Sequence, residues 1–288
     1  MSAVTSVGPA LPAVTGTPRR RRGRWNVPLV AGLTLFALIV LCAVCAPLLT
    51  SYDPIQQNLT DAFLPPGAKD HLLGTDAFGR DVFSRLLYGA RVDLKVGVLA
   101  VISPFVIGSL LGLIAGWFGG WVDAVISRIV DMVIAFPFLV LVIALVFAMG
   151  PGTTSIYTAI TLVGWVAYCR IVRGQVLIAK EQEYAMAARA SGLPTWRILL
   201  RHLLPNVVLQ AFVFSMSDIV LTLLAIVTLG FLGLGVPPPT PDWGTMIQEG
   251  QQFILDKWYM STIPGLAVVL TGLALALIAD GIVEKANK

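Results

Sequence analysis

Long apolar runs alternate with short polar stretches along this 288-residue chain. A helix needs about 20 predominantly apolar residues to cross the hydrocarbon core of a bilayer, and six runs are at or above that length. We therefore predict an all-α polytopic membrane protein with six transmembrane helices. The runs lie at residues 27–49, 96–118, 123–148, 154–175, 207–233 and 262–283.

The first apolar run follows a cluster of basic residues, Arg19 to Arg22 with Arg24. A basic stretch before an apolar one is also typical of a signal peptide, but this run is longer than a signal core and long enough to span a bilayer. We expect it to be an uncleaved first helix. The chain then divides into a disordered basic cytoplasmic tail at 1–26, a first transmembrane helix at 27–49, an extracytoplasmic cap segment at 50–95 and a five-helix core at 96–285.

Composition and charge position favour a membrane protein over a nucleic-acid binder. Hydrophobic residues make up 57% of the chain and charged residues 12%, with a mean hydropathy of +0.83, whereas about a quarter of residues are charged in soluble domains. With six spans, the termini share a side with the polar segment after the fourth run. That side carries fourteen Lys and Arg residues and the other side six. The positive-inside rule therefore predicts that both termini are cytoplasmic.

Glycine and proline mark special packing within two of the runs. Gly108, Gly112 and Gly116 recur at four-residue spacing, so they share one helix face and allow a neighbouring helix to approach closely. Pro137 interrupts the third run, where we expect it to kink the helix.

The three cysteines, Cys42, Cys45 and Cys169, all lie in apolar runs. Cys42 and Cys45 are one helical turn apart, but no second Cys pair or nearby His completes a metal or redox site. We expect them to be small packing residues, and we expect no metal and no cofactor in this chain.

A polar, Ala-rich island, the elbow (residues 183–206), lies between the fourth and fifth runs. Its alanines favour helix, Gly192 suits a left-handed helix cap, and Pro194 suits the first turn of a new helix. We predict two short helices joined at a corner and closed by Pro205. The elbow then either offers its backbone to a groove in a soluble partner or is a plain amphipathic connector.

A second polar stretch, residues 71–94, lies between the first two runs and contains Asp76, Arg80, Asp81 and Arg85. We expect these four side chains to pair with one another in a structured extracytoplasmic cap. No nucleophile or metal-ligand cluster accompanies the two aspartates, so acid–base catalysis is not favoured.

The elbow resembles the EAA loop of ABC-importer permeases, which docks into a cleft of the ATP-binding subunit. Met186 stands where the family usually has Glu, and His202 where it usually has Ile; His is familiar there in the peptide-permease branch. The loss of a charge at Met186 puts one salt bridge to the ATPase in doubt. The resemblance implies a coupling loop at about residues 180–206, with ATPase-coupling positions Glu183, Met186, Ala187, Ala188, Gly192, Leu204 and Pro205.

The stretch after the first run closely resembles the GTDxxGRDxxSRxxxGxR signature of the dipeptide/oligopeptide/nickel branch of these permeases, specifically the C-type subunit. The FLGLG run at 231–235 and Asp280–Gly281 agree with the same branch, while Ile226 stands near where many relatives carry Glu. The resemblance covers about residues 25–285. Its signature positions here are Gly74, Thr75, Asp76, Gly79, Arg80, Asp81, Ser84 and Arg85, followed by Gly89 and Arg91.

The resemblance implies a type I ABC-importer permease in the bacterial cytoplasmic membrane that forms half of a pathway for dipeptides or oligopeptides. Nickel chelates, glutathione or short oligosaccharides are alternative cargoes. No GxxxxGK[ST] phosphate loop occurs, so the chain is not expected to be an enzyme. ATP and Mg would then bind partner subunits. The implied partners are a homologous second permease, two ATP-binding subunits of one or two kinds, an extracytoplasmic solute-binding protein, the lipid bilayer and a peptide substrate.

Asp218 is the charged residue within the fifth run, about 18 Å along a helix from Asn206 at ~1.5 Å per residue. A carboxylate at that depth avoids lipid. We expect Asp218 either to line a translocation path or to bond to a neighbouring helix or subunit. An ion-coupled secondary transporter is the alternative of another class, but it would need paired ionisable groups at mid-membrane, and a non-transporting scaffold is a further one.

Overall fold

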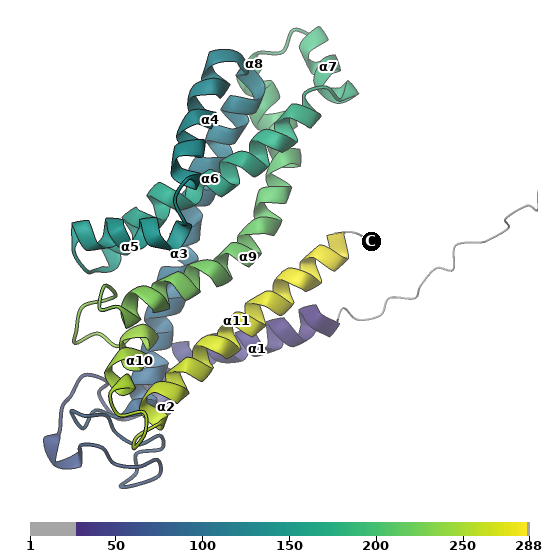
Figure 1. The fold of residues 1–288 in the computed structure, drawn as a ribbon. Coiled ribbons are helices and arrows are strands. Elements are labelled where there is room, and N and C mark those ends of the chain that lie inside the picture. The colour runs from purple at the N-terminus through teal and green to yellow at the C-terminus, as the bar shows by residue number, and fades with distance from the viewer. Residues whose placement is uncertain (1–26, 287–288) are drawn as a thin grey trace, which may run out of the picture.

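The computed structural model describes residues 27–286, and the regular structure of this range is helical (Figure 1). The basic tail expected at 1–26 lies outside the described residues. The elements are α1 (Val27–Val44), α2 (Ala46–Leu49), η1 (Leu59–Asp61), α3 (Val82–Phe118), α4 (Gly120–Ile134), α5 (Phe138–Met149), α6 (Thr153–Ala179), α7 (Glu183–Ala190), α8 (Thr195–Arg197), η2 (Ile198–Leu203), α9 (Leu204–Phe231), α10 (Trp243–Gln251) and α11 (Tyr259–Ala286).

Five helical stretches in the described range are long and apolar enough to cross a membrane, and a sixth span results if α4 and α5 are counted together. The third apolar run is therefore not one kinked helix. It is two helices bent by 86° at the break before Pro137, which is the N-cap of α5. A proline lacks the N–H that would continue the helical ladder and disfavours helix at the residue before it. The kink predicted at Pro137 is confirmed, as a complete break.

Close packing of α3 against α6 forms the centre of the molecule, and the predicted glycine face makes that contact. A Cβ on Gly108 would lie 2.2 Å from the carbonyl oxygen of Trp165, and one on Gly112 would lie 2.5 Å from that of Cys169. Such distances are too short for any side chain. The prediction that these glycines allow close helix approach is confirmed.

Helices α1 and α11 lie side by side and diverge from the rest of the bundle (Figure 1). Gly32 allows this approach, because a Cβ there would lie 2.8 Å from the carbonyl oxygen of Ala274. The long α3 runs between the two ends of the molecule, with the cap segment at one end and α7 at the other (Figure 1). The two predicted functional regions are therefore at opposite ends.

The helix α3 begins fourteen residues earlier than the second apolar run suggests. Asp81 is its N-cap, and the Asp81 carboxylate accepts a hydrogen bond from the backbone N–H of Ser84 at 2.7 Å. An N-cap carboxylate satisfies a donor that the first helical turn leaves free. Residues 82–95, which precede the apolar run, therefore belong to α3, and the cap segment ends inside a helix.

Candidate functional site

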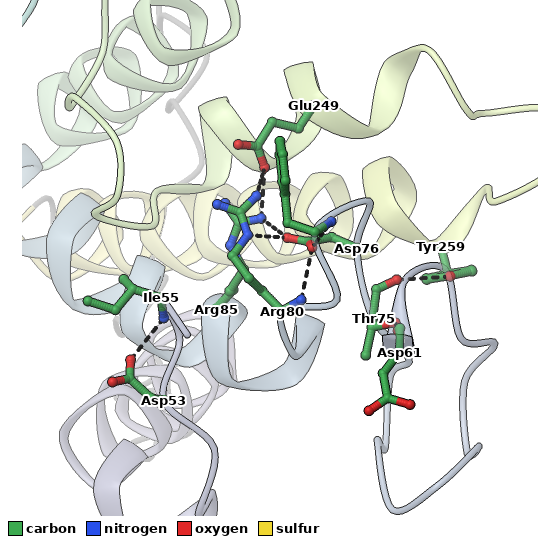
Figure 2. Close-up of polar contacts among 10 residues, drawn as sticks. Asp53, Ile55, Asp61, Thr75, Asp76, Arg80, Arg85, Glu249 and Tyr259 are labelled. Atoms are coloured by element: carbon green, nitrogen blue, oxygen red, sulfur yellow. Dashed lines mark hydrogen bonds and ion pairs between the residues drawn. The ribbon is translucent and has the colours of Figure 1, made fainter. Parts of the chain in front are cut away.

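Two acidic and two basic side chains form a buried charge cluster in the cap segment (Figure 2). The Asp76 carboxylate accepts a hydrogen bond from Arg80 Nε at 2.6 Å and another from Arg85 Nη1. Glu249 on α10 accepts from both guanidinium groups, at 2.8 Å from Arg80 and 2.7 Å from Arg85. Buried charges are tolerated when they are paired and hydrogen-bonded, and this cluster balances two positive and two negative charges. It connects the cap segment to α10.

Asp81 does not join this cluster, so the prediction that all four signature charges pair with one another is wrong for it. Its Oδ1 lies 2.8 Å from His71 Nδ1, and its Oδ2 caps α3. The His71 ring stacks on Tyr52, with 4.4 Å between ring centroids. Asp81 is the N-cap of α3, so its carboxylate bonds to the first turn of that helix. Arg80 and Arg85 instead bond to Glu249 on α10.

Backbone contacts hold the rest of the cap segment in one conformation. Gly79 has a φ of +70°, and a Cβ on it would lie 1.8 Å from the carbonyl oxygen of Asn58. The Tyr259 hydroxyl on α11 donates to the carbonyl oxygens of Leu64 and Thr75, at 2.9 and 3.0 Å. The cap segment is therefore structured, as predicted, and attached to α11 as well as α10.

Trp243 joins α3 to α10 at the base of the cap segment. Its side chain is fully buried; its backbone N–H donates to Asp93 at 2.9 Å and its indole N–H to the Leu86 carbonyl at 3.0 Å. Next to it, Asp242 caps α10 by accepting from the Thr245 N–H at 3.0 Å. Burial raises the pKa of the Asp242 carboxyl, while its hydrogen bonds with Thr245 act in the opposite direction. The FLGLG–PDWG stretch is thus a packed corner.

The corner predicted in the elbow is present, with one shift. Gly192 has a φ of +69° directly after α7, as predicted. Pro194 is the N-cap of α8 and not part of its first turn. Ala185 and Ala188 are buried in the same core cluster as Val176 of α6, while Ala187 is exposed. Of the two alanines expected as coupling positions, Ala187 is accessible and Ala188 packs inward, because Ala188 lies three residues from Ala185 on the same helix face.

Two basic residues fix α7 to the ends of α3 and α6. The Arg189 guanidinium lies over the Trp117 ring, 4.4 Å from its centroid, and donates to the Lys180 carbonyl at 3.1 Å. Lys180 in turn donates to the Gly116 carbonyl at 3.1 Å. These contacts make the elbow continuous with the packed core.

Pro205 does not close the elbow. The chain stays helical from Thr195 to Phe231, with a π-helical turn, η2, just before Leu204 and Pro205. A proline ring inside an α-helix clashes with the carbonyl four residues earlier, here that of Arg201, and a wider π turn relieves that crowding. The fifth span therefore begins within the elbow.

The face of the elbow away from the core is partly apolar. Tyr184 and Met186 are 40% and 48% exposed on α7, and Trp196 on α8 is 60% exposed. Glu183 and Ala187 are exposed beside them. Several large apolar side chains exposed in one short segment are typical of a contact surface for another protein. Sequence reasoning missed Tyr184 and Trp196, although both lie in the segment it singled out.

A cavity of about 700 Å³ lies among the α4–α5 bend, α6 and α9. Most of its lining is apolar, with Gly164 contributed by α6 and Phe214 by α9. Asp218 and Arg170 are its two charged lining residues among those described. The Asp218 Oδ2 accepts a hydrogen bond from the Tyr168 hydroxyl at 2.6 Å, so this carboxylate has a bond to a neighbouring helix and also faces the cavity.

Three further residues of these sites were not identified from the sequence: Glu249, Tyr168 and Arg170. Glu249 lies more than 160 positions from the arginines that it contacts, and no local pattern marks such a partner. Arg170 interrupts an apolar run, and a charged residue within a membrane-spanning segment is itself a signal of a functional position. Within residues 27–286 no group of three or more His, Cys, Asp or Glu side chains has the arrangement of a metal site.

Comparison with known proteins places this chain among membrane components of transport systems. Residues 108–288 match the family described as binding-protein-dependent transport system inner membrane component, and residues 20–66 match the N-terminal transmembrane domain of oligopeptide transport permease C. The chain is 40% identical over 263 residues to the dipeptide transport system permease protein DppC of Bacillus subtilis, covering 91% of this chain and 82% of that protein. It is 38% identical to the di/tripeptide transport system permease protein of Pseudomonas aeruginosa, covering 89% and 86%. It is also 38% identical to the glutathione transport system permease protein of Pectobacterium atrosepticum, covering 91% and 87%.

Solved structures show the same fold at low sequence identity. The inward-facing methionine ABC transporter MetNI aligns with a TM-score of 0.56 at 20% identity, covering 70% of this chain and 95% of its own. An amino acid ABC transporter crystallised with histidines aligns with a TM-score of 0.53 at 15% identity, covering 68% and 91%. The predicted ABC-importer permease fold is confirmed.

Proposed function

The chain belongs to the family of binding-protein-dependent transport system inner membrane components, in its oligopeptide permease C branch, and we propose that it forms half of the translocation pathway of an ATP-driven importer of dipeptides or oligopeptides. The observation that carries the peptide assignment is 38–40% identity, over most of each chain, to permeases of dipeptide and di/tripeptide systems. Glutathione is the second candidate cargo, because a glutathione permease is equally similar. Family membership argues against the ion-coupled and scaffold alternatives.

Energy for this transport comes from partner subunits. The sequence carries no GxxxxGK[ST] phosphate loop, so ATP and Mg bind separate ATPase subunits, two copies of one kind or one of each of two kinds. A homologous permease completes the pathway, and a solute-binding protein delivers the peptide. ATP acts by favouring one of two conformations of the helix bundle.

The elbow is the contact for the ATPase in this proposal. Its coupling positions lie on or beside the exposed face: Glu183, Met186, Ala187, Gly192, Leu204 and Pro205. Ala188 supports that face from inside. The partly apolar surface of Tyr184, Met186 and Trp196 supports this assignment. Leu204 and Pro205 start α9, so displacement of the elbow is transmitted directly to a helix that lines the cavity.

The cap segment faces the opposite side of the membrane from the elbow. The distribution of Lys and Arg supports a cytoplasmic elbow and cytoplasmic termini. In a variant without the three native cysteines, Thr195→Cys should react with an impermeant maleimide only from the cytoplasm and Leu72→Cys only from outside. Both positions are exposed in the structure. Labelling of both from the same face would disprove this topology.

Asp218 lines the pathway in this proposal. A carboxylate facing lipid at mid-membrane costs roughly 2.5–3.5 kcal/mol, whereas Asp218 faces a cavity and accepts a bond from Tyr168 with one oxygen only.

Uptake by the reconstituted complex tests the proposed function. Ala-Ala should be imported, and should stimulate ATP hydrolysis, only when this chain, the second permease, the ATPases and the binding protein are all present. Import without this chain would refute the proposal.

A further inference from the structure

The cavity has two charged walls of opposite sign. Asp218 lies on α9 and Arg170 on α6. We infer that these two side chains hold the two ends of a short zwitterionic peptide, the Arg170 guanidinium binding the carboxylate and the Asp218 carboxylate binding the ammonium group. This inference rests on the proposed function, in which the cavity is part of the peptide's path.

The two charges belong to helices that pack against each other and that both line the cavity. The Tyr168 hydroxyl donates to the Asp218 carboxylate at 2.6 Å, a bond that links α6 to α9 next to the cavity. Arg170 is two residues further along α6, which is about 3 Å along the helix axis. Tyr168 and Arg170 point to different sides of α6, so Tyr168 orients the carboxylate while Arg170 remains directed at the cavity.

Both charges have unused capacity for a ligand. Arg170 is exposed and forms no hydrogen bond or ion pair with any described residue, in contrast to Arg173 one turn later, which donates to Asp123 at 2.5 and 2.6 Å. The Asp218 Oδ1 accepts no hydrogen bond within the described range, since Tyr168 donates to Oδ2. A guanidinium within an apolar helix of a membrane protein is costly unless it faces a wet cavity or a partner charge. A peptide carboxylate supplies that charge and matches the planar fork of the guanidinium.

The rest of the cavity lining explains why the side chains of the peptide would matter less for recognition than its two charged ends. Most of the remaining lining residues are apolar, with Phe136, Phe138 and Phe214 among them. The volume of about 700 Å³ is within the range of small-molecule sites, about 300–1,000 Å³. A dipeptide spans about 7 Å at ~3.3–3.6 Å per residue. Free termini are common to all short peptides, so recognition at both ends favours short peptides while accepting varied side chains.

Uptake of end-blocked peptides by the complete transporter tests this inference. Ala-Ala, Ala-Ala-amide and N-acetyl-Ala-Ala are compared in proteoliposomes, at concentrations that saturate the binding protein for each peptide. Arg170→Gln should reduce uptake of the two peptides with a free carboxylate about tenfold, the lower end of the effect of losing a charge-assisted hydrogen bond, and leave Ala-Ala-amide unchanged. Asp218→Asn should reduce the two peptides with a free ammonium group and leave N-acetyl-Ala-Ala unchanged.

Two controls separate recognition from structural damage. Arg128→Gln makes the same change at an exposed position on α4 that does not line the cavity, and it should leave all three rates unchanged. Arg170→Lys keeps the positive charge and should restore most of the carboxylate preference.

Equal loss of uptake for all three peptides in Arg170→Gln would show that Arg170 pairs with the partner permease or a lipid headgroup. That result would overturn the inference while leaving the proposed function intact. Unchanged rates in both variants would overturn it in the same way, whereas failure of the wild-type complex to import any of the three peptides would overturn the proposed function and the inference together.

Discussion

The buried charge cluster that joins the cap segment to α10 predicts a large and specific effect of removing Glu249. Glu249→Ala removes the carboxylate that accepts from Arg80 at 2.8 Å and from Arg85 at 2.7 Å. The two guanidinium groups are 5% and 3% exposed and would keep only Asp76 as a counter-charge. The cluster would then carry one uncompensated positive charge on two nearly buried side chains.

The expected cost follows from this geometry. Breaking a buried ion pair by removing one partner typically destabilises by 3–5 kcal/mol. Because the Glu249 side chain is 21% exposed, water would replace part of the lost interaction, and we expect about 3 kcal/mol. Glu249→Gln keeps an acceptor oxygen and should cost about 1–2 kcal/mol, since it loses charge but leaves the donors partnered.

Thermal inactivation of the purified transporter, measured at one fixed scan rate, provides the comparison. Lys69→Ala is the control, because Lys69 pairs with Asp61 in the same segment but is 64% exposed, and exposed pairs contribute about 0–1 kcal/mol. The order of stability should be wild type and Lys69→Ala, then Glu249→Gln, then Glu249→Ala. If Glu249→Ala were as stable as Lys69→Ala, the cluster would not hold the cap segment on α10.

Three further changes separate coupling from packing. Ala188→Phe, at a buried position, should lower the amount of folded complex in the membrane, whereas Ala187→Phe, at an exposed one, should leave the amount unchanged and uncouple ATP hydrolysis from uptake; loss of abundance in both would contradict this division. Gly79→Ala should prevent the cap segment from folding, seen as protease sensitivity, because it adds a clash with the Asn58 carbonyl to a φ of +70°. A Cβ at Gly192 would meet no atom within 4 Å, so we expect backbone strain of about 1–2 kcal/mol to be the main cost of Gly192→Val, which should assemble but couple poorly; a fully active variant would show that the corner tolerates it.

Local patterns in the sequence predicted those features that depend on neighbouring residues. Apolar run length located five single-helix spans, and glycine at positions 108, 112 and 116 predicted the close contact of α3 with α6. The positive φ at Gly192 followed from its place after an Ala-rich helix. Each of these depends on residues within a few turns of one another.

Features that depend on distant parts of the chain were mispredicted or missed. The arginines of the cap signature pair with Glu249, which no local pattern connects to them. Ala188 resembles Ala187 in sequence, and only the position of α7 against α6 decides which of the two is buried. Pro205 appeared to end the elbow because its usual effect is to break a helix, whereas the π turn before it keeps the helix continuous.

That continuity gives α9 a particular place in the molecule. The helical stretch from Thr195 to Phe231 contains 37 residues and is about 55 Å long. One end lies in the elbow, Asp218 is near its middle in the cavity wall, and the other end packs through Gly230 against Gly244 of α10. Helix α10 carries Glu249 and therefore the cap segment. This continuous helical stretch connects the surface proposed for the ATPase, the proposed peptide site and the cap by direct packing, so a displacement of the elbow need not pass through a loop to reach the other two.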